Sequence, residues 1–265
     1  MHYRLTDMTH GRRAGFTLLE VIIAIGIIAL LLALLLPALE RAREQANNLR
    51  CATNLNQIGV ALVIYSNDNH GQYPRTTYIP GAPLCAGTNA AAPDPFKSGG
   101  PQPNDVTAPL FLLMRAEGIP PKIFNEPYND ELVNEPEPTK TPLSRSNFTD
   151  YRKNLGYSFA NPYPDAHAVA AGYQFLNKMN SAFALAADLN PGTGANQNSR
   201  NHEKRGQNVL FADYHVEWKF TALCGVKDER GSDDIYTSKT GDIMVSPVDG
   251  STISVTPGHF RCSPK

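Results

Sequence analysis

The sequence predicts an α+β fold, with one long N-terminal helix packed on a C-terminal antiparallel sheet. Three observations support this prediction. An almost uninterrupted apolar run covers residues 16–39, and apolar residues then recur at helical spacing to about residue 66. Fourteen of the 21 prolines fall between Pro74 and Pro142, which predicts mostly loop. Short strand-like runs follow in residues 151–265.

The apolar run is long enough to span a membrane. Its 24 residues would extend roughly 36 Å as a helix at ~1.5 Å per residue, against a hydrocarbon core of about 30 Å. Gly15 precedes the run, so cleavage there would retain the apolar segment, whereas a signal peptide is cut after its apolar core. Arginines flank the run on both sides, so their count does not fix the orientation.

One carboxylate, Glu20, lies near the start of this run. An ionisable group within a spanning helix is costly and is usually paired. Two readings follow. Glu20 is a boundary residue that reaches the membrane surface, or it requires a positive partner. A new amino terminus at Phe16, created by cleavage, would supply that partner.

The second half of the helix is amphipathic. Pro37 removes one helical hydrogen bond and predicts a kink, but helical spacing resumes after it. We expect Leu49, Leu55, Ile58 and Leu62 to pack on the chain's own domain rather than to form a coiled-coil stalk.

A short helix is predicted at Pro109–Ala116 within an otherwise mobile, loop-rich surface segment. Thr107 is expected to cap its start, and Gly118 is expected to end it.

Four later runs read as strands: Leu155–Ala160, Phe183–Ala187, Gln207–Ala212 and His215–Phe220. Asp213 and Tyr214 separate the last two runs, which predicts a hairpin. A tight two-residue turn favours glycine where Tyr214 stands. Either the turn is wider than two residues, or the backbone of Tyr214 is strained.

The N-terminal residues Gly15, Phe16, Thr17, Leu18 and Glu20, followed by the apolar run and Pro37, resemble a type IV pilin or type II secretion pseudopilin precursor. The resemblance implies a pilin-like fold, cleavage after Gly15 by a prepilin peptidase and N-methylation of Phe16. It also implies a single-pass inner-membrane protein that assembles with other copies, or other pilins, into a periplasmic or extracellular filament. Glu20 would then neutralise the terminal amine of an adjacent subunit.

The C-terminal part is similar to a planctomycete-type group of pilin-like proteins that carry histidine, nine residues, then Asp-Gly. His202, Asp213 and His215 mark the matching segment. The chain departs from the pattern, because ten residues separate His202 from Asp213 and Tyr214 replaces the glycine.

These features predict a leader at 1–15, a membrane or filament-core segment at 16–39 and a soluble domain at 40–265. In that domain the helix continues to about residue 66, residues 74–150 form the loop region, and residues 151–265 form the sheet region.

Charge and cysteine content narrow the function classes. The chain has net charge −1; residues 1–15 hold three arginines and one aspartate, so the remainder has 21 basic and 24 acidic residues, a net −3. This gives no electrostatic basis for nucleic-acid binding. All four cysteines follow the apolar run. The resemblance favours a Cys224–Cys262 disulfide, with Cys51–Cys85 second, and buried thiols are the alternative.

The best candidate chemical cluster is Asp188, His202, Asp213 and His215, whose side chains can bind a transition metal. However, the two histidines lie thirteen residues apart on different predicted elements, and polar residues at a hairpin commonly bond the local backbone. The acidic segment around Asp228 and Asp234 lacks EF-hand spacing. We therefore expect no metal, no cofactor and no enzymatic activity. The alternative to a filament subunit is a membrane-anchored adhesive or ligand-binding protein that presents residues 74–150.

Overall fold

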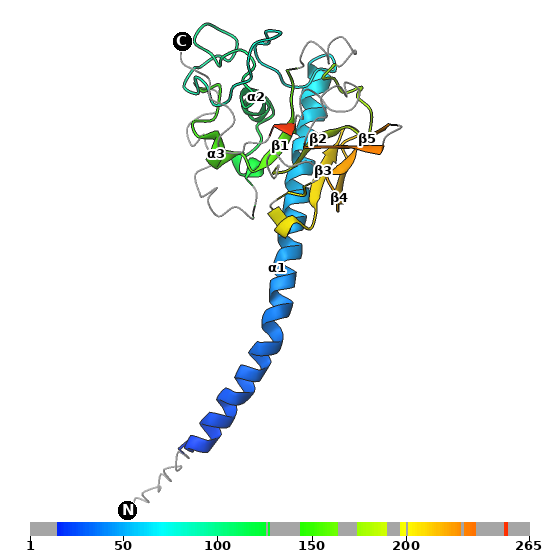
Figure 1. Cartoon of the computed structure of the whole chain (residues 1–265). Coiled ribbons are helices and arrows are strands. Elements are labelled where there is room, and N and C mark those ends of the chain that lie inside the picture. The colour runs from blue at the N-terminus through cyan, green and yellow to red at the C-terminus, as the bar shows by residue number, and fades with distance from the viewer. Residues whose placement is uncertain are drawn as a thin grey trace, which may run out of the picture. The chain divides into compact units, whose positions relative to one another are not determined.

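A computed structural model describes residues 15–125, 127, 144–163, 174–189, 197–199, 201–228, 231–236 and 252–253. The chain divides into two compact units, residues 1–45 and 46–265. Helix α1 (Leu18–Asp68) is one continuous element of 51 residues that contains Pro37 (Figure 1). The predicted leader, apart from Gly15, lies outside the described residues.

The first unit contains the apolar part of α1. Its large apolar side chains are exposed from Phe16 to Leu36, and none packs on a core. This helix is long and apolar enough to cross a membrane by length and composition.

Within the second unit, α1 buries a stripe that differs in part from the predicted one. Cys51, Leu55, Ile58 and Leu62 lie in the main hydrophobic core, as expected for a helix face with this spacing. The prediction for Leu49 was wrong, because this side chain is 69% exposed. Two residues correspond to about 200° around a helix, so Leu49 and Cys51 point in nearly opposite directions.

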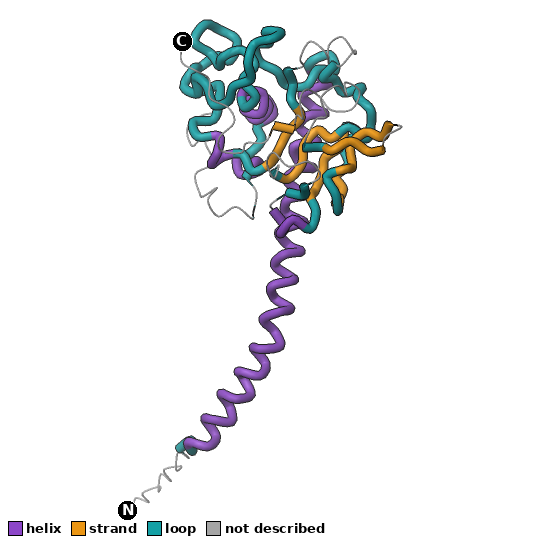
Figure 2. Tube along the Cα trace, in the orientation of Figure 1, coloured by secondary structure: helices purple, strands orange, loops and turns teal. Residues whose placement is uncertain are grey.

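The main sheet has five strands in the order β4-β3-β2-β1-β7, and all neighbouring pairs are antiparallel. Figure 2 shows these strands in orange. Their bounds are β1 (Tyr157–Ala160), β2 (Ala184–Asp188), β3 (Gln207–Phe211), β4 (Val216–Lys219) and β7 (Thr252–Ile253). A separate pair is formed by β5 (Leu223–Asp228) and β6 (Gly231–Asp234). The predicted strands and the α+β class are confirmed.

The two faces of the sheet bury different clusters. Leu185 and Leu210 join the core that contains α1. Val209 and Phe211 lie in a second cluster with Ile235 and Tyr236. Gly59 permits a close approach between helix and sheet, because a Cβ atom there would lie 2.9 Å from Leu210 Cδ1.

In the sequence, α2 (Ala108–Glu117), the 3₁₀ turn η1 (Pro121–Phe124) and α3 (Tyr151–Asn154) follow α1 and precede β1. Gly118 ends α2 in the left-handed conformation, as predicted. Thr107 makes no capping bond with its side chain, which corrects the prediction. Asp105 caps the helix instead, since its Oδ1 accepts from the Thr107 and Ala108 N–H groups at 3.0 and 3.2 Å.

Asp105 also holds together parts of the segment at residues 74–150 that the sequence predicted to be mostly loop. Its Oδ2 accepts from the Thr88 N–H, the Thr88 hydroxyl and the Asn147 amide. Both oxygens of this fully buried carboxylate are therefore bonded, and they join residues that are far apart in the chain. Residues 128–143 of the predicted loop region lie outside the described residues.

The difference between Leu55 and Leu49 gives a matched test of the helix packing. Leu55→Ala in the full-length chain should lower the free energy of unfolding by about 2–5 kcal/mol, because it opens a cavity in the core. Leu49→Ala, on the exposed face of the same helix, should change it by no more than about 0.5 kcal/mol. Denaturant unfolding in detergent, followed by Trp218 fluorescence, measures both. Equal losses would contradict the described packing.

Candidate functional site

The first candidate site is the start of α1. The Thr17 N–H and Thr17 Oγ1 donate to Glu20 Oε2 at 2.8 and 2.9 Å, and the Glu20 N–H lies 3.3 Å from Thr17 Oγ1. This reciprocal arrangement is a capping box, which satisfies backbone donors that the first turn of a helix leaves without partners. The carboxylate also lies at the positive end of the helix dipole. Glu20 is therefore stabilised locally.

The surroundings of this box are apolar and uncovered. Phe16 is 82% exposed, and the large side chains of the following turns are exposed as well. An apolar surface of this extent is typical of a segment that is covered by lipid or by other helices. The structure thus places Glu20 in the first turn of an uncovered apolar helix, with Gly15 and Phe16 just before the helix begins.

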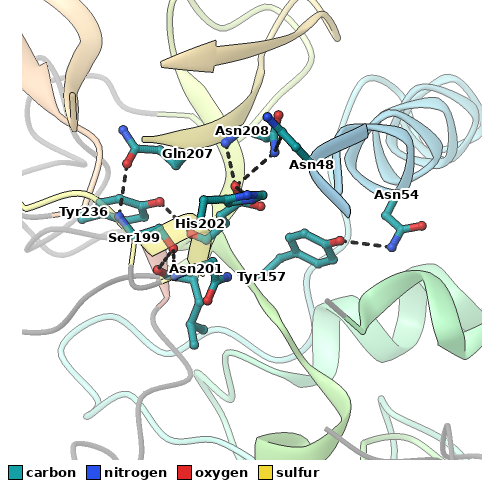
Figure 3. Close-up of polar contacts among 11 residues, drawn as sticks. Asn48, Asn54, Tyr157, Ser199, Asn201, His202, Gln207, Asn208 and Tyr236 are labelled. Atoms are coloured by element: carbon teal, nitrogen blue, oxygen red, sulfur yellow. Dashed lines mark hydrogen bonds and ion pairs between the residues drawn. The ribbon is translucent and has the colours of Figure 1, made fainter. Parts of the chain in front are cut away.

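The second candidate site lies where β2, β3 and α1 meet in the second unit. Asp188 Oδ2 accepts from the Asn208 backbone N–H at 2.7 Å and from Asn208 Nδ2 at 3.2 Å. Asn208 Nδ2 also donates to Asn48 Oδ1 of α1 at 2.8 Å. His202 Nε2 lies 3.1 Å from the same Asp188 oxygen. Figure 3 shows His202, Asn208 and Asn48 converging there.

An unusual backbone turn brings His202 to this place. His202, Glu203 and Lys204 have φ values of 53°, 55° and 62°, in the left-handed region. That conformation costs roughly 1–2 kcal/mol per residue other than glycine. The turn directs the His202 ring inward, where Trp218 contacts it edge-on at a centroid distance of 4.9 Å.

Further polar groups form hydrogen bonds next to Asp188 and His202. Tyr236 donates to the Asp188 carbonyl at 2.7 Å, and burial raises the pKa of that phenol well above its usual value. Ser199 donates from its N–H to Gln207 Oε1 at 3.2 Å. Gly206 has no room for a side chain, because a Cβ atom would lie 2.5 Å from the Lys219 carbonyl oxygen. The buried groups are thus held in one geometry.

Cys51 also belongs to this site. Its Sγ, one Asp188 oxygen and one His202 ring nitrogen all lie within 4.8 Å of one another, and all three residues are buried. Thiol, carboxylate and imidazole are all metal ligands. The sequence did not link Cys51 to the other two, because 136 residues lie between it and Asp188 and no local spacing rule spans that interval.

Asp213 and His215 lie elsewhere, so the predicted four-residue cluster is divided into two pairs. His215 Nδ1 is bonded to Asp213 Oδ1 on the exposed β3–β4 hairpin, and His215 Nε2 lies 3.6 Å from Glu217. Desolvation by itself raises the pKa of the Asp213 carboxyl, but the hydrogen bonds from His215 lower it. The net result is a pKa below the ordinary value. This pair bonds within the hairpin, as polar residues at turns commonly do.

The hairpin also answers the question about Tyr214. The Tyr214 N–H donates to the Phe211 carbonyl at 2.8 Å and the Phe211 N–H donates to the His215 carbonyl at 3.0 Å, so the turn is wider than two residues. Tyr214 nevertheless has φ 69°, a position that favours glycine. Its hydroxyl bonds to that of Tyr73 at 3.1 Å and its ring packs on the core, which compensates for the strain.

The remaining cysteine predictions stay predictions. The Cys85 thiol donates to the Pro103 carbonyl at 3.6 Å, away from the Asp188 site. Cys224 packs beside the second cluster, and its proposed partner Cys262 lies outside the described residues.

Comparison with known proteins agrees with the N-terminal geometry. Residues 10–36 match the family model described as the prokaryotic N-terminal methylation motif. The chain is also similar to the type II secretion system core protein G of Aeromonas hydrophila, with 34% identity over 95 residues. That alignment covers 35% of this chain and 64% of the relative's length. No solved structure matches the chain. Together these findings show that the N-terminal part of the chain is similar to prepilin-type N-terminal segments and to a type II secretion protein.

Asn208 gives a test of the buried network. Asn208→Ala removes the amide that joins Asn48 to Asp188 and should lower the free energy of unfolding by about 1–3 kcal/mol. The control Asn56→Ala removes an exposed amide from α1 and should have an effect within about 0.5 kcal/mol. Chemical denaturation of the two full-length variants checks the difference. If Asn208→Ala is as stable as the control, the amide does not hold α1 to the sheet.

Proposed function

We propose that this chain is a structural subunit of a type IV pilus-like or type II secretion pseudopilus filament. It is made as a prepilin, cleaved after Gly15 and N-methylated on Phe16. The observation that carries the proposal is the capped start of a fully exposed apolar helix two residues after Gly15. The methylation-motif match over the same residues and the similarity to a type II secretion protein support it.

Before assembly, α1 anchors the subunit in the inner membrane as a single span. Every backbone group in a bilayer needs an internal partner, and a helix supplies partners for all but its ends. The Thr17–Glu20 box serves the N-terminal end with atoms of the helix itself. Gly15 then lies just outside the helix, where a membrane-embedded prepilin peptidase would find an unfolded peptide bond.

During assembly, the exposed apolar side chains of α1 exchange lipid contacts for contacts with other subunits. Helices associate in this setting through close packing and polar pairs, because lipid tails are as apolar as leucine. The new amine at Phe16 supplies a positive charge, and Glu20 of an adjacent subunit neutralises it. Among the residues that the structure describes, all hydrogen bonds to the Glu20 carboxylate go to Oε2. The other oxygen, Oε1, would accept a hydrogen bond from the Phe16 amine of the adjacent subunit.

A structural role for the second unit fits the burial of its polar cluster. Cys51 and Asp188 are 0% exposed and His202 is 2% exposed, so a substrate has no access to them. The pilin and pseudopilin families consist of structural subunits rather than enzymes. We therefore assign the second unit to the filament surface, where it is exposed to the periplasm or the exterior.

The proposed charge pair predicts the phenotype of one carboxylate. Glu20→Ala should leave cleavage intact but give few or no filaments, because the buried amine of the neighbouring subunit loses its counter-charge. Glu40→Ala removes an exposed carboxylate from the same helix and serves as the control. Immunoblotting reports processing, and electron microscopy of sheared or secreted material reports filaments.

Normal filaments from the Glu20→Ala variant would rule out the charge pair. Surface-exposed, membrane-bound wild-type protein without filaments would instead support a membrane-anchored adhesive or ligand-binding protein.

Processing has its own readout in the mature protein. Tandem mass spectrometry of membrane-extracted protein should find an N-terminal peptide that begins at Phe16 and carries one added methyl group on its amine. Gly15→Val should block this product, because a bulky side chain replaces the small residue before the cleaved bond. A terminus at Met1 in the wild-type protein would contradict the proposal.

A further inference from the structure

The site formed by Cys51, Asp188 and His202 carries an inference that is independent of filament assembly. The three residues come from α1, from β2 and from the left-handed turn at residues 201–204. One donor atom from each lies within 4.8 Å of the other two. A thiolate, a carboxylate and an imidazole at such separations match the ligand types that zinc prefers.

The Asp188 carboxylate is incompletely bonded. Asn208 and His202 both approach Oδ2, whereas Oδ1 is buried and accepts no hydrogen bond from any residue that the structure describes. Asp105 offers an internal comparison, because both oxygens of that equally buried carboxylate are bonded to several donors. A buried oxygen without a donor is unfavourable unless another group, such as a cation, pairs with it.

The surroundings have the features of a supported metal site. Asn208 holds the carboxylate through its N–H and its amide, and Asn48 in turn accepts from that amide. Trp218 fixes the edge of the His202 ring. Such outer contacts orient the ligands of metal centres. The strained left-handed turn that directs His202 inward is also typical of functional sites.

We propose that Cys51, Asp188 and His202 bind one divalent transition-metal ion of the zinc type. The ion joins α1 to the sheet, and the burial of all three residues assigns it a structural role, with a fourth ligand beyond these three completing the coordination shell. Binding releases the thiol proton of Cys51, so that the sulfur binds as thiolate, and His202 binds as neutral imidazole. This proposal replaces the expectation, drawn from spacing and from the usual role of polar residues at hairpins, that the chain binds no metal. It also excludes the Cys51–Cys85 disulfide.

Metal titration of the wild-type full-length chain tests the site without relying on a variant. The chain is purified in detergent under reducing conditions, treated with a chelator and titrated with Zn²⁺ or with Co²⁺. We expect one Zn²⁺ per chain, a higher unfolding temperature with Zn²⁺ and a thiolate-to-cobalt charge-transfer absorption with Co²⁺. The proposal is overturned if the wild-type chain shows none of these, since a buried water would then be the partner of Asp188 Oδ1.

Matched cysteine variants locate the site. Cys51→Ser and Asp188→Asn should each weaken Zn²⁺ affinity by at least about 100-fold, beyond the 10–100-fold typical of outer-shell changes. Cys85→Ser changes another buried thiol and should retain wild-type affinity and the cobalt band. An equal loss in Cys85→Ser and Cys51→Ser would place the ion elsewhere. Peptide mapping that finds Cys51 in a disulfide would also refute the site.

Discussion

Close packing of α1 on β3 is the constraint on which the second unit depends. Gly59 brings the helix so near to the sheet that Leu210 would contact any side chain placed there. Because the helix face is fixed by this contact, the residues one turn before and after it, Leu55 and Leu62, are buried as well. The same orientation places Asn48 and Cys51 beside Asp188. One hydrophobic contact therefore sets both the core and the polar site.

Local patterns were sufficient to predict α1, α2 and the strands β1 to β4, but not β5 to β7. The alternation and length of the apolar runs located β1 to β4, and the combination of Pro109 with Gly118 located α2. Both signals depend on neighbours in the chain, which is why they could be read directly. Leu49 was misplaced because apolar residues occur on both the buried and the exposed face of a helix, and only the partner surface decides which face is buried. Thr107 was misplaced as a cap because its hydroxyl is bonded to the Gly87 N–H, Asp105 Oδ1 and Asn147 Oδ1 instead of to its own helix.

The sequence predicted the residues of the N-terminal site but not the full set of residues in the buried site. Gly15, Phe16 and Glu20 form a contiguous motif, so their proximity follows from chain connectivity. The buried site joins residues 51, 188, 202 and 208, which only the fold brings together. His202 and Asp213 appeared as one signature in the sequence, yet His202 is buried beside Asp188 and Asp213 lies on an exposed hairpin. Their spacing reflects the length of β3 and its turn, not a shared ligand.

The capping box at the start of α1 has a consequence for maturation. Among the residues that the structure describes, which begin at Gly15, the bonds of this box join only Thr17 and Glu20. Removal of the leader would therefore leave the first helical turn bonded as before. If the chain is processed as proposed, precursor and mature chain would share one folded helix, and cleavage would change only the charge at the tip. Proteolysis would then act as a chemical switch for polymerisation that requires no refolding.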